Sequence, residues 1–382
     1  MKFTTTLIAA VAAVLNVMPA SAQDIKIIDT VELSGAGAVS GTNWQRGVDL
    51  AVKEINAAGG VLGRKIAVEH YDNQSNPGTA RAMVAKALDQ EPQLLLGPIF
   101  SGDVMVTMAA AQQAEIPQIV GGEAAAITRQ GNPYVFRSSL SQAAAMPKLA
   151  NYLANEMKVH SLAVVWVNND FGKGGRDAML EEMKKRDITL AADISTESGQ
   201  LDFSSAVNAA MKSNADALFS YTNEEESARL LRELRKQGYS KPIFGETVLI
   251  SQKVIELAGG AAEGVKGHVG LATEAPNPLI RDMVAKFEKA YGEKPDHNGI
   301  KGYYAVYLFK AVSEKNGKID PKLFAKSIPG IRLSAKDYPG ILLDIAYNQK
   351  GDIDRESYLV EVKDGKQAIM ATLPMAGVEN LK

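Results

Sequence analysis

Short apolar runs alternate with longer amphipathic stretches from residue 24 onward. Residues 25–33 form the first apolar run. Apolar residues then recur at the spacing of one helix face, at Trp44, Val48, Ala51 and Ile55. The same alternation predicts strands at 66–71, 94–96 and 116–120 and helices at 79–88 and 103–114. A repeated strand–helix order is typical of parallel βαβ units in a doubly wound sheet.

The strand–helix order begins again after Arg137. The strongly apolar run at 162–167 reads as a buried strand. Further predicted elements are helices at 173–185, 203–212 and 225–237, strands at 188–193, 216–221 and 242–245, helices within 277–330, and final strands at 341–347 and 357–362. Two α/β series of similar length predict an α/β protein with two doubly wound, Rossmann-like lobes. Because no low-complexity linker separates the series, we expect several short crossings between the lobes.

The first 22 residues have the pattern of a secretory signal peptide. Lys2 is followed by an apolar run at 7–17 and by the small residues Ala20-Ser21-Ala22. The run is shorter than the ~20 residues that a membrane-spanning helix needs. We therefore expect export, cleavage after Ala22 and a mature protein that begins near Gln23.

Composition narrows the class of protein. Without residues 1–22 the chain keeps about 360 residues, more than one hydrophobic core usually serves. With 42 basic and 44 acidic residues, the chain lacks the positive excess that binds nucleic acids or anionic membranes. It contains no cysteine, so disulfides, thiolate nucleophiles and cysteine metal sites are excluded.

Three glycine-rich turns follow predicted strands in the first series. The turn at 34–41 precedes a helix, and its free N–H groups would suit either a nucleotide phosphate or a smaller carboxylate. Its GxGxxxG spacing departs from the GxGxxG of dinucleotide sites, which favours the carboxylate. The turn at 97–102 places the Ser101 hydroxyl at a helix start, where a plain N-cap is the alternative. The third turn is 121–125, and all three should converge because the carboxyl ends of parallel strands share one edge.

Polar and aromatic residues end the strands of the second series as well. They lie at 168–172, 221–224 and 245–247. The acidic run at 224–226 equally suits a solvated helix start, and Asn168 to Asp170 equally suit a turn.

The sequence lacks the usual catalytic patterns. It contains no GxSxG turn, no HExxH or HxxxH pair and no GxxxxGK[ST] loop. The four histidines fall in different elements and read as surface or packing residues: His70, His160, His268 and His297. We therefore expect no catalytic residue, no metal and no cofactor.

Short motifs that occur together in one known family are spread over nearly the whole mature chain. The most specific is the INxxGGxxG stretch at 55–63. The other matching positions are Leu33-Ser34-Gly35 with Gly41, Gly47, Ala51, Asp72, Pro77, Gly97-Pro98, Ser101-Gly102, Tyr134 to Arg137, Phe171-Gly172 and Ala262 to Val265. On these residues the chain resembles the periplasmic solute-binding proteins of ABC importers, in the branched-chain amino acid group of the type I binding proteins.

The resemblance implies two lobes joined by three hinge crossings, near 138–141, 272–276 and 345–350. The implied boundaries are 23–139 plus 274–346 for the first lobe and 140–273 plus 347–382 for the second. Such a protein, expected to be a monomer, would close on a small carboxylated ligand and present it to the permease subunits of an ABC importer.

The resemblance also implies which residues hold the ligand. In members that bind amino acids, a serine turn and the turn after the next strand hold the carboxylate, and the second lobe supplies an aromatic ring and an acid. The corresponding candidates here are Ser40, Phe100, Ser101, Gly102, Gly121, Gly122, Glu123, Ala124, Phe171, Asn223, Glu224, Glu246 and Thr247.

Two positions depart from the family pattern. Thr247 stands at the acidic position for the α-amino group, with Glu246 one residue earlier, and Phe171 replaces a common tyrosine. A carboxylate without an amine, such as an aromatic or other organic acid, is therefore an alternative to an amino acid, although Glu123 or Glu224 would restore an amine partner. A ligand sensor of a signalling system and an exported enzyme are the alternative functions.

Overall fold

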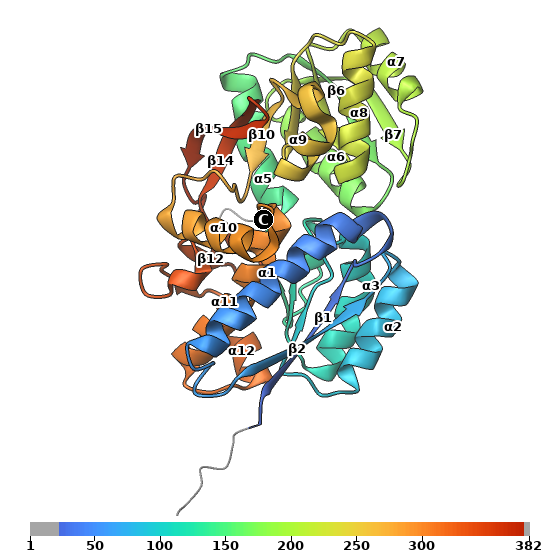
Figure 1. Ribbon diagram of the computed structural model, residues 1–382. Coiled ribbons are helices and arrows are strands. Elements are labelled where there is room, and N and C mark those ends of the chain that lie inside the picture. Colours follow the sequence, from blue (N-terminus) through green and yellow to red (C-terminus); the bar gives the residue numbers. More distant parts are fainter. Residues whose placement is uncertain (1–22, 378–382) are drawn as a thin grey trace, which may run out of the picture.

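The computed structural model describes residues 23–377. The predicted signal peptide, 1–22, and the predicted cleavage after Ala22 lie outside these residues. Two lobes, each built around its own sheet, are stacked along the long axis of the molecule (Figure 1). The two-lobe α/β fold predicted from the sequence is therefore confirmed.

The first lobe contains a five-stranded parallel sheet in the order β2-β1-β3-β4-β5. Its strands are β1 (Ile25–Val31), β2 (Ile66–Asp72), β3 (Leu94–Leu96), β4 (Gln118–Val120) and β5 (Val135–Arg137). The last three strands are buried at every residue. Continuous burial is typical of parallel strands with helices on both faces, and it explains why these strands read as plain apolar runs.

Two separate parts of the chain supply the helices of this lobe. They are η1 (Gly35–Gly37), α1 (Ala38–Ala57), α2 (Pro77–Leu88), α3 (Ser101–Ala114) and α4 (Ala126–Arg129), followed much later by α10 (Pro278–Tyr291), α11 (His297–Asn316) and α12 (Pro321–Ser327). Helix α11 packs along α1 (Figure 1).

Glycine allows these two helices to approach closely. A Cβ atom on Gly47 would lie 2.0 Å from the Gly299 carbonyl oxygen, and one on Gly302 would lie 2.4 Å from the Trp44 carbonyl oxygen. Neither distance leaves room for a side chain. The contact fixes the start of α11 against the first lobe, although α1 ends at Ala57 and α11 begins only at His297.

The second lobe contains a seven-stranded sheet in the order β15-β14-β10-β9-β8-β6-β7. Its strands are β6 (Ser161–Val167), β7 (Thr189–Thr196), β8 (Ala217–Tyr221), β9 (Ile243–Glu246), β10 (Lys266–Val269), β14 (Ser357–Lys363) and β15 (Lys366–Leu373). Its helices are α5 (Gln142–Asn155), α6 (Asp170–Lys184), α7 (Ser204–Lys212), α8 (Glu224–Lys236), α9 (Gln252–Ala258) and η2 (Gly259–Ala262). Strands β6 to β10 run parallel, and β14 and β15 add an antiparallel hairpin at the edge.

The strand predicted at 341–347 is present only over its last residues. A short third sheet contains β11 (Arg332–Leu333), β12 (Ile345–Tyr347) and β13 (Ile353–Asp354), and the turn η3 (Pro339–Ile341) precedes β12. Leu342 has a φ of 66°, which strand residues do not adopt. Its segment is apolar because Leu342 and Leu343 are buried, not because the backbone is extended.

The chain passes between the two lobes three times. The passages follow β5, β10 and the third sheet, so 138–141 and 270–277 connect the lobes and the last passage leads into β14. The exact lobe boundaries at 139, 273 and 346 stay predictions.

A polar cluster in the first lobe joins β1, β2 and α1. The ring of His70 lies between two carboxylates, with Nδ1 2.8 Å from Asp29 and Nε2 3.0 Å from Asp49. Trp44 Nε1 donates to the other Asp29 oxygen at 3.0 Å. Burial alone would lower the pKa of His70, but hydrogen bonds to Asp29 and Asp49 and their charges raise it to about 10.

This cluster predicts a loss of stability in alkali. The pKa of His70 is higher in the folded state than its ordinary value of about 6.5. The charged ring therefore makes its full contribution to the free energy of unfolding below pH 6.5, and that contribution disappears as the pH rises through about 10. We expect His70→Asn to cost about 1.5–3 kcal/mol at pH 6 and much less at pH 10.5. Urea unfolding at both pH values, with the exposed His160→Asn as control, measures this difference. An equal cost at the two pH values would contradict a charged His70.

Candidate functional site

A cavity of about 210 Å³ lies between the two lobes. Its lining comes from both lobes and from three of the four parts of the chain that the passages separate. The residues that line it are Ala36, Ser40, Ser75, Pro77, Ile99, Phe100, Ser101, Gly102, Asp103, Gly121, Glu123, Asn169, Phe171, Ser198, Asn223, Glu224, Val248, His297, Asn298 and Lys301.

The three glycine-rich turns of the first lobe meet at this cavity, as predicted. Ala36 and Ser40 come from the turn after β1, Ile99 to Gly102 from the turn after β3, and Gly121 and Glu123 from the turn after β4. Parallel strands place their carboxyl ends along one edge, so turns distant in sequence become neighbours.

A buried acid fixes the turn after β3. Glu32 accepts hydrogen bonds from the N–H groups of Ile99 at 3.1 Å and Phe100 at 2.9 Å. Helix α3 then begins at Ser101, and no side chain caps its first N–H groups. Those groups have no acceptor within the helix and point out of its start, where an anion is favoured.

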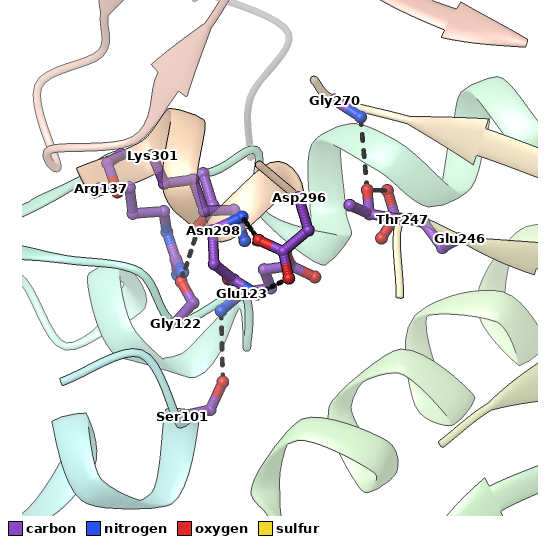
Figure 2. A network of polar contacts seen from close by, with 12 residues as sticks. Ser101, Gly122, Glu123, Arg137, Glu246, Thr247, Gly270, Asp296, Asn298 and Lys301 are labelled. Atoms are coloured by element: carbon purple, nitrogen blue, oxygen red, sulfur yellow. Dashed lines mark hydrogen bonds and ion pairs between the residues drawn. The ribbon is translucent and has the colours of Figure 1, made fainter. Parts of the chain in front are cut away.

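Ser101 connects this helix start to the turn after β4. Its hydroxyl oxygen accepts hydrogen bonds from the N–H groups of Glu123 at 3.2 Å and Ala124 at 3.1 Å (Figure 2). The N–H groups of Glu123 and Ala124, in the turn expected to hold the carboxylate, are therefore occupied here. The Ser101 hydroxyl hydrogen remains to be donated, and the two accepted bonds strengthen it as a donor.

Arg137 holds the same turn from behind. Its side chain is fully buried and donates to the carbonyl oxygens of Gly122 and Ala124, both at 2.6 Å (Figure 2). It also forms an ion pair with Asp352. Gly122 and Ala124 do not line the cavity, and their carbonyl groups face Arg137.

The second lobe supplies the starts of α6 and α8. Asn169 and Phe171 come from the first, and the Phe171 ring stacks on Tyr221 with 4.3 Å between ring centroids. Asn223 and Glu224 come from the second.

Glu224 is a buried acid without a cation. Only 6% of the residue is exposed. The side-chain amide of Asn298 donates to its carboxylate at 3.5 Å. Within residues 23–377, no basic side chain lies within ion-pair distance of it. Burial raises the pKa of Glu224, and a hydrogen bond from Ser40 and the more distant charge of Lys301 partly offset that rise.

Glu246 and Thr247 do not line the cavity. The Glu246 carboxylate accepts a hydrogen bond from the Thr247 hydroxyl at 2.5 Å and lies 3.1 Å from the ring of His268, its register partner on β10. Gly270 N–H donates to Thr247 (Figure 2). Burial raises the pKa of Glu246 to about 7. The Glu246 carboxyl group also lies beside Glu123 of the first lobe. The role of Glu246 and Thr247 as ligand contacts stays a prediction.

The sequence prediction missed three lining residues at the start of α11: His297, Asn298 and Lys301. Lys301 is buried, and its Nζ lies 2.6 Å from Glu123 Oε1. Burial raises the pKa of Glu123, and the charge of Lys301 opposes that rise. His297 was expected to be a surface or packing residue. The spacing of His297 and Lys301, one helical turn apart, was the signal available in the sequence.

Comparison with known proteins identifies the family. The family model described as "Periplasmic binding protein" matches residues 25–367. The chain belongs to this family.

Individual relatives are distant in sequence but similar over nearly their whole length. The Leu/Ile/Val-binding protein homolog 1 of Brucella melitensis is 23% identical over 352 residues, which cover 92% of this chain and 93% of the relative. A solute-binding protein of an ABC transporter from R. palustris, solved with benzoate, has a TM-score of 0.85 at 21% identity and covers 93% of this chain and 98% of its own. A branched-chain amino acid transporter substrate-binding protein from Streptococcus pneumoniae, solved with isoleucine, has a TM-score of 0.81 at 21% identity and covers 93% and 99%.

Family membership settles the broad class of function. Periplasmic binding proteins are exported and bind small solutes without transforming them, so this chain is an exported solute-binding protein and not an enzyme. In the part of the chain that the structure describes, no helix is long and apolar enough to cross a membrane. The same residues contain no cluster of three or more acidic or histidine side chains suited to a metal ion.

Proposed function

We propose that this protein binds a small amino acid in the cavity between its lobes and delivers it to the permease subunits of an ABC importer. The observation that carries the proposal is the unpaired Glu224 carboxylate in the same cavity as Ser101 and the open start of α3. One lobe thus offers a place for an anion and the other a place for a cation.

The first lobe would hold the carboxylate. The Ser101 hydroxyl donates to it, and the uncapped N–H groups of α3 supply further donors and the positive end of the helix dipole. Hydrogen bonds to a charged group are among the stronger ones in proteins.

The second lobe would hold the α-amino group. A carboxylate buried without a cation is unfavourable, and an ammonium group bound beside Glu224 supplies the missing charge. Binding the two ends of one molecule to different lobes also favours the closed arrangement of the lobes.

Apolar residues that line the cavity suit the side chain of the amino acid. Ile99 and Phe100 come from the first lobe, and Phe171 and Val248 from the second. Relatives named for leucine, isoleucine and valine, and the structure solved with isoleucine, support an amino acid.

An aromatic carboxylate is the second candidate. The rings of Phe100 and Phe171 line the cavity from opposite lobes, and the similar R. palustris protein was solved with benzoate. Such a ligand would use Ser101 but leave Glu224 without a cation.

Thermal unfolding with separate additions of leucine, isoleucine, phenylalanine, benzoate and 4-hydroxybenzoate tests the proposal. We expect at least one amino acid to raise the melting temperature, since a ligand that binds only the native state stabilises it. The mature chain for this test begins at Gln23, after the proposed cleavage, and we expect it to be monomeric.

Glu224→Gln should weaken amino acid binding by about 10-fold, because the amide oxygen still accepts a hydrogen bond but carries no charge. Titration calorimetry of this variant measures the loss. The neighbouring Glu225→Gln is the matched control, since Glu225 pairs with Arg229 on the surface of α8. Equal affinities of the two variants would contradict an ammonium site at Glu224. No stabilisation by any carboxylate would overturn the proposed function itself.

A further inference from the structure

The start of α11 lies in the cavity wall, but its backbone is not free to bind a solute. The Asp296 side chain accepts hydrogen bonds from the N–H groups of Asn298 at 2.7 Å and Gly299 at 3.1 Å. Whatever α11 contributes to the cavity therefore comes from its side chains.

Three side chains from the start of α11 line the cavity, and two of them, Asn298 and Lys301, already have protein partners. Lys301 pairs with Glu123, and the Asn298 side-chain amide contacts Asp296 and Glu224. His297 differs from both, because no residue within 23–377 forms a hydrogen bond with either nitrogen of its ring. The residue is nevertheless 95% buried.

The surroundings of the His297 ring determine its protonation state. Burial and the nearby charge of Lys301 lower the pKa of His297 well below its ordinary range, so the imidazole is neutral and carries one N–H. Nδ1 is enclosed by protein and has no partner, whereas Nε2 is not enclosed and the residue lines the cavity. An enclosed N–H without an acceptor is rarer than an enclosed acceptor without a donor, which assigns the hydrogen to Nε2.

We propose that His297 is a specificity residue, whose Nε2–H donates to an oxygen on the side chain of the bound solute. The inference rests on the proposed function and names its substrate more closely: a carboxylated solute that carries a hydroxyl or carbonyl oxygen in addition to its carboxylate. The carboxylate of the solute is assigned to Ser101 and its ammonium group to Glu224. Neither of these groups therefore serves as the acceptor for the His297 Nε2–H.

This role predicts discrimination between solutes that differ by one hydroxyl group. A solute without the oxygen leaves the His297 N–H unpaired in a closed cavity, which costs affinity by about 5- to 150-fold. Suitable pairs are tyrosine and phenylalanine, threonine and valine, and 4-hydroxybenzoate and benzoate.

The test is calorimetric titration of each pair into the wild-type protein and three variants. His297→Phe keeps a ring but removes the N–H, and His297→Gln restores an N–H near the position of Nε2. His160→Phe is the control, because His160 is exposed on the second lobe. We expect the wild type, the control and His297→Gln to prefer the hydroxylated member of the pair that binds, and His297→Phe to lose that preference.

Three outcomes would overturn the inference: a wild-type preference for the member without the hydroxyl, an unchanged preference in His297→Phe, or an equal loss of affinity for both members in that variant. The last result would place His297 against the shared carboxylate or in a purely structural role. Failure of every solute to bind the wild type would instead overturn the proposed function. If His297→Phe fails to fold, the preference of His297→Asn, which lacks a donor at the position of Nε2, decides in its place.

Discussion

Replacing Arg137 with methionine destabilises the protein by about 3–5 kcal/mol, the largest effect that we expect of a single substitution. The change leaves the Asp352 carboxylate buried without its cation. It also removes the donors to the Gly122 and Ala124 carbonyl groups. Methionine fills a similar volume, so the cost reflects lost polar contacts. Urea denaturation followed by circular dichroism measures it.

Arg281→Met is the matched control, because Arg281 is exposed on α10. Its free energy of unfolding should stay within about 0.5 kcal/mol of the wild type. A similarly small effect for Arg137→Met would show that the buried ion pair contributes nothing to holding the turn after β4.

Replacing Ser101 with alanine lowers the affinity for every carboxylated solute by about 100-fold. The variant loses a hydrogen bond to a charged group, which is worth about 1.5–3 kcal/mol. It also leaves the N–H groups of Glu123 and Ala124 without their acceptor, so the turn beside the ligand loses its support. Calorimetric titration with a solute found in the thermal experiments gives the ratio of dissociation constants.

Ser139→Ala separates binding from folding. The Ser139 hydroxyl donates to the Gly122 carbonyl group at 3.1 Å, in the same turn, but Ser139 does not line the cavity. We expect this variant to bind within a few-fold of the wild type. If Ser139→Ala and Ser101→Ala lost affinity equally, the effect would come from the turn and not from contact with the solute.

The sequence predicted the first-lobe side of the site well because that side depends on local rules. Turns that follow parallel strands must share an edge, so Ser40, Ser101 and Glu123 could be placed together without a structure. The apolar runs of β3 and β4 were recognisable for the same reason, since buried parallel strands need no polar alternation.

The other side of the site depends on contacts that no local pattern encodes. His297 and Lys301 reach the cavity only because Gly47 and Gly302 let α11 pack closely on α1. Glu246 ends a strand as predicted, but its carboxylate contacts Thr247 and His268 and does not line the cavity. Which way a strand-end side chain turns is decided by the adjacent strand, which the sequence alone did not identify.

A crystal structure of the protein with its solute would show which residues hold each end of the bound molecule. We expect a carboxylated molecule between the lobes, with a carboxylate oxygen within hydrogen-bond distance of the Ser101 hydroxyl and an amino group beside Glu224. A solute bound outside this cavity, or one in the cavity whose carboxylate lies away from Ser101 and the start of α3, would contradict it.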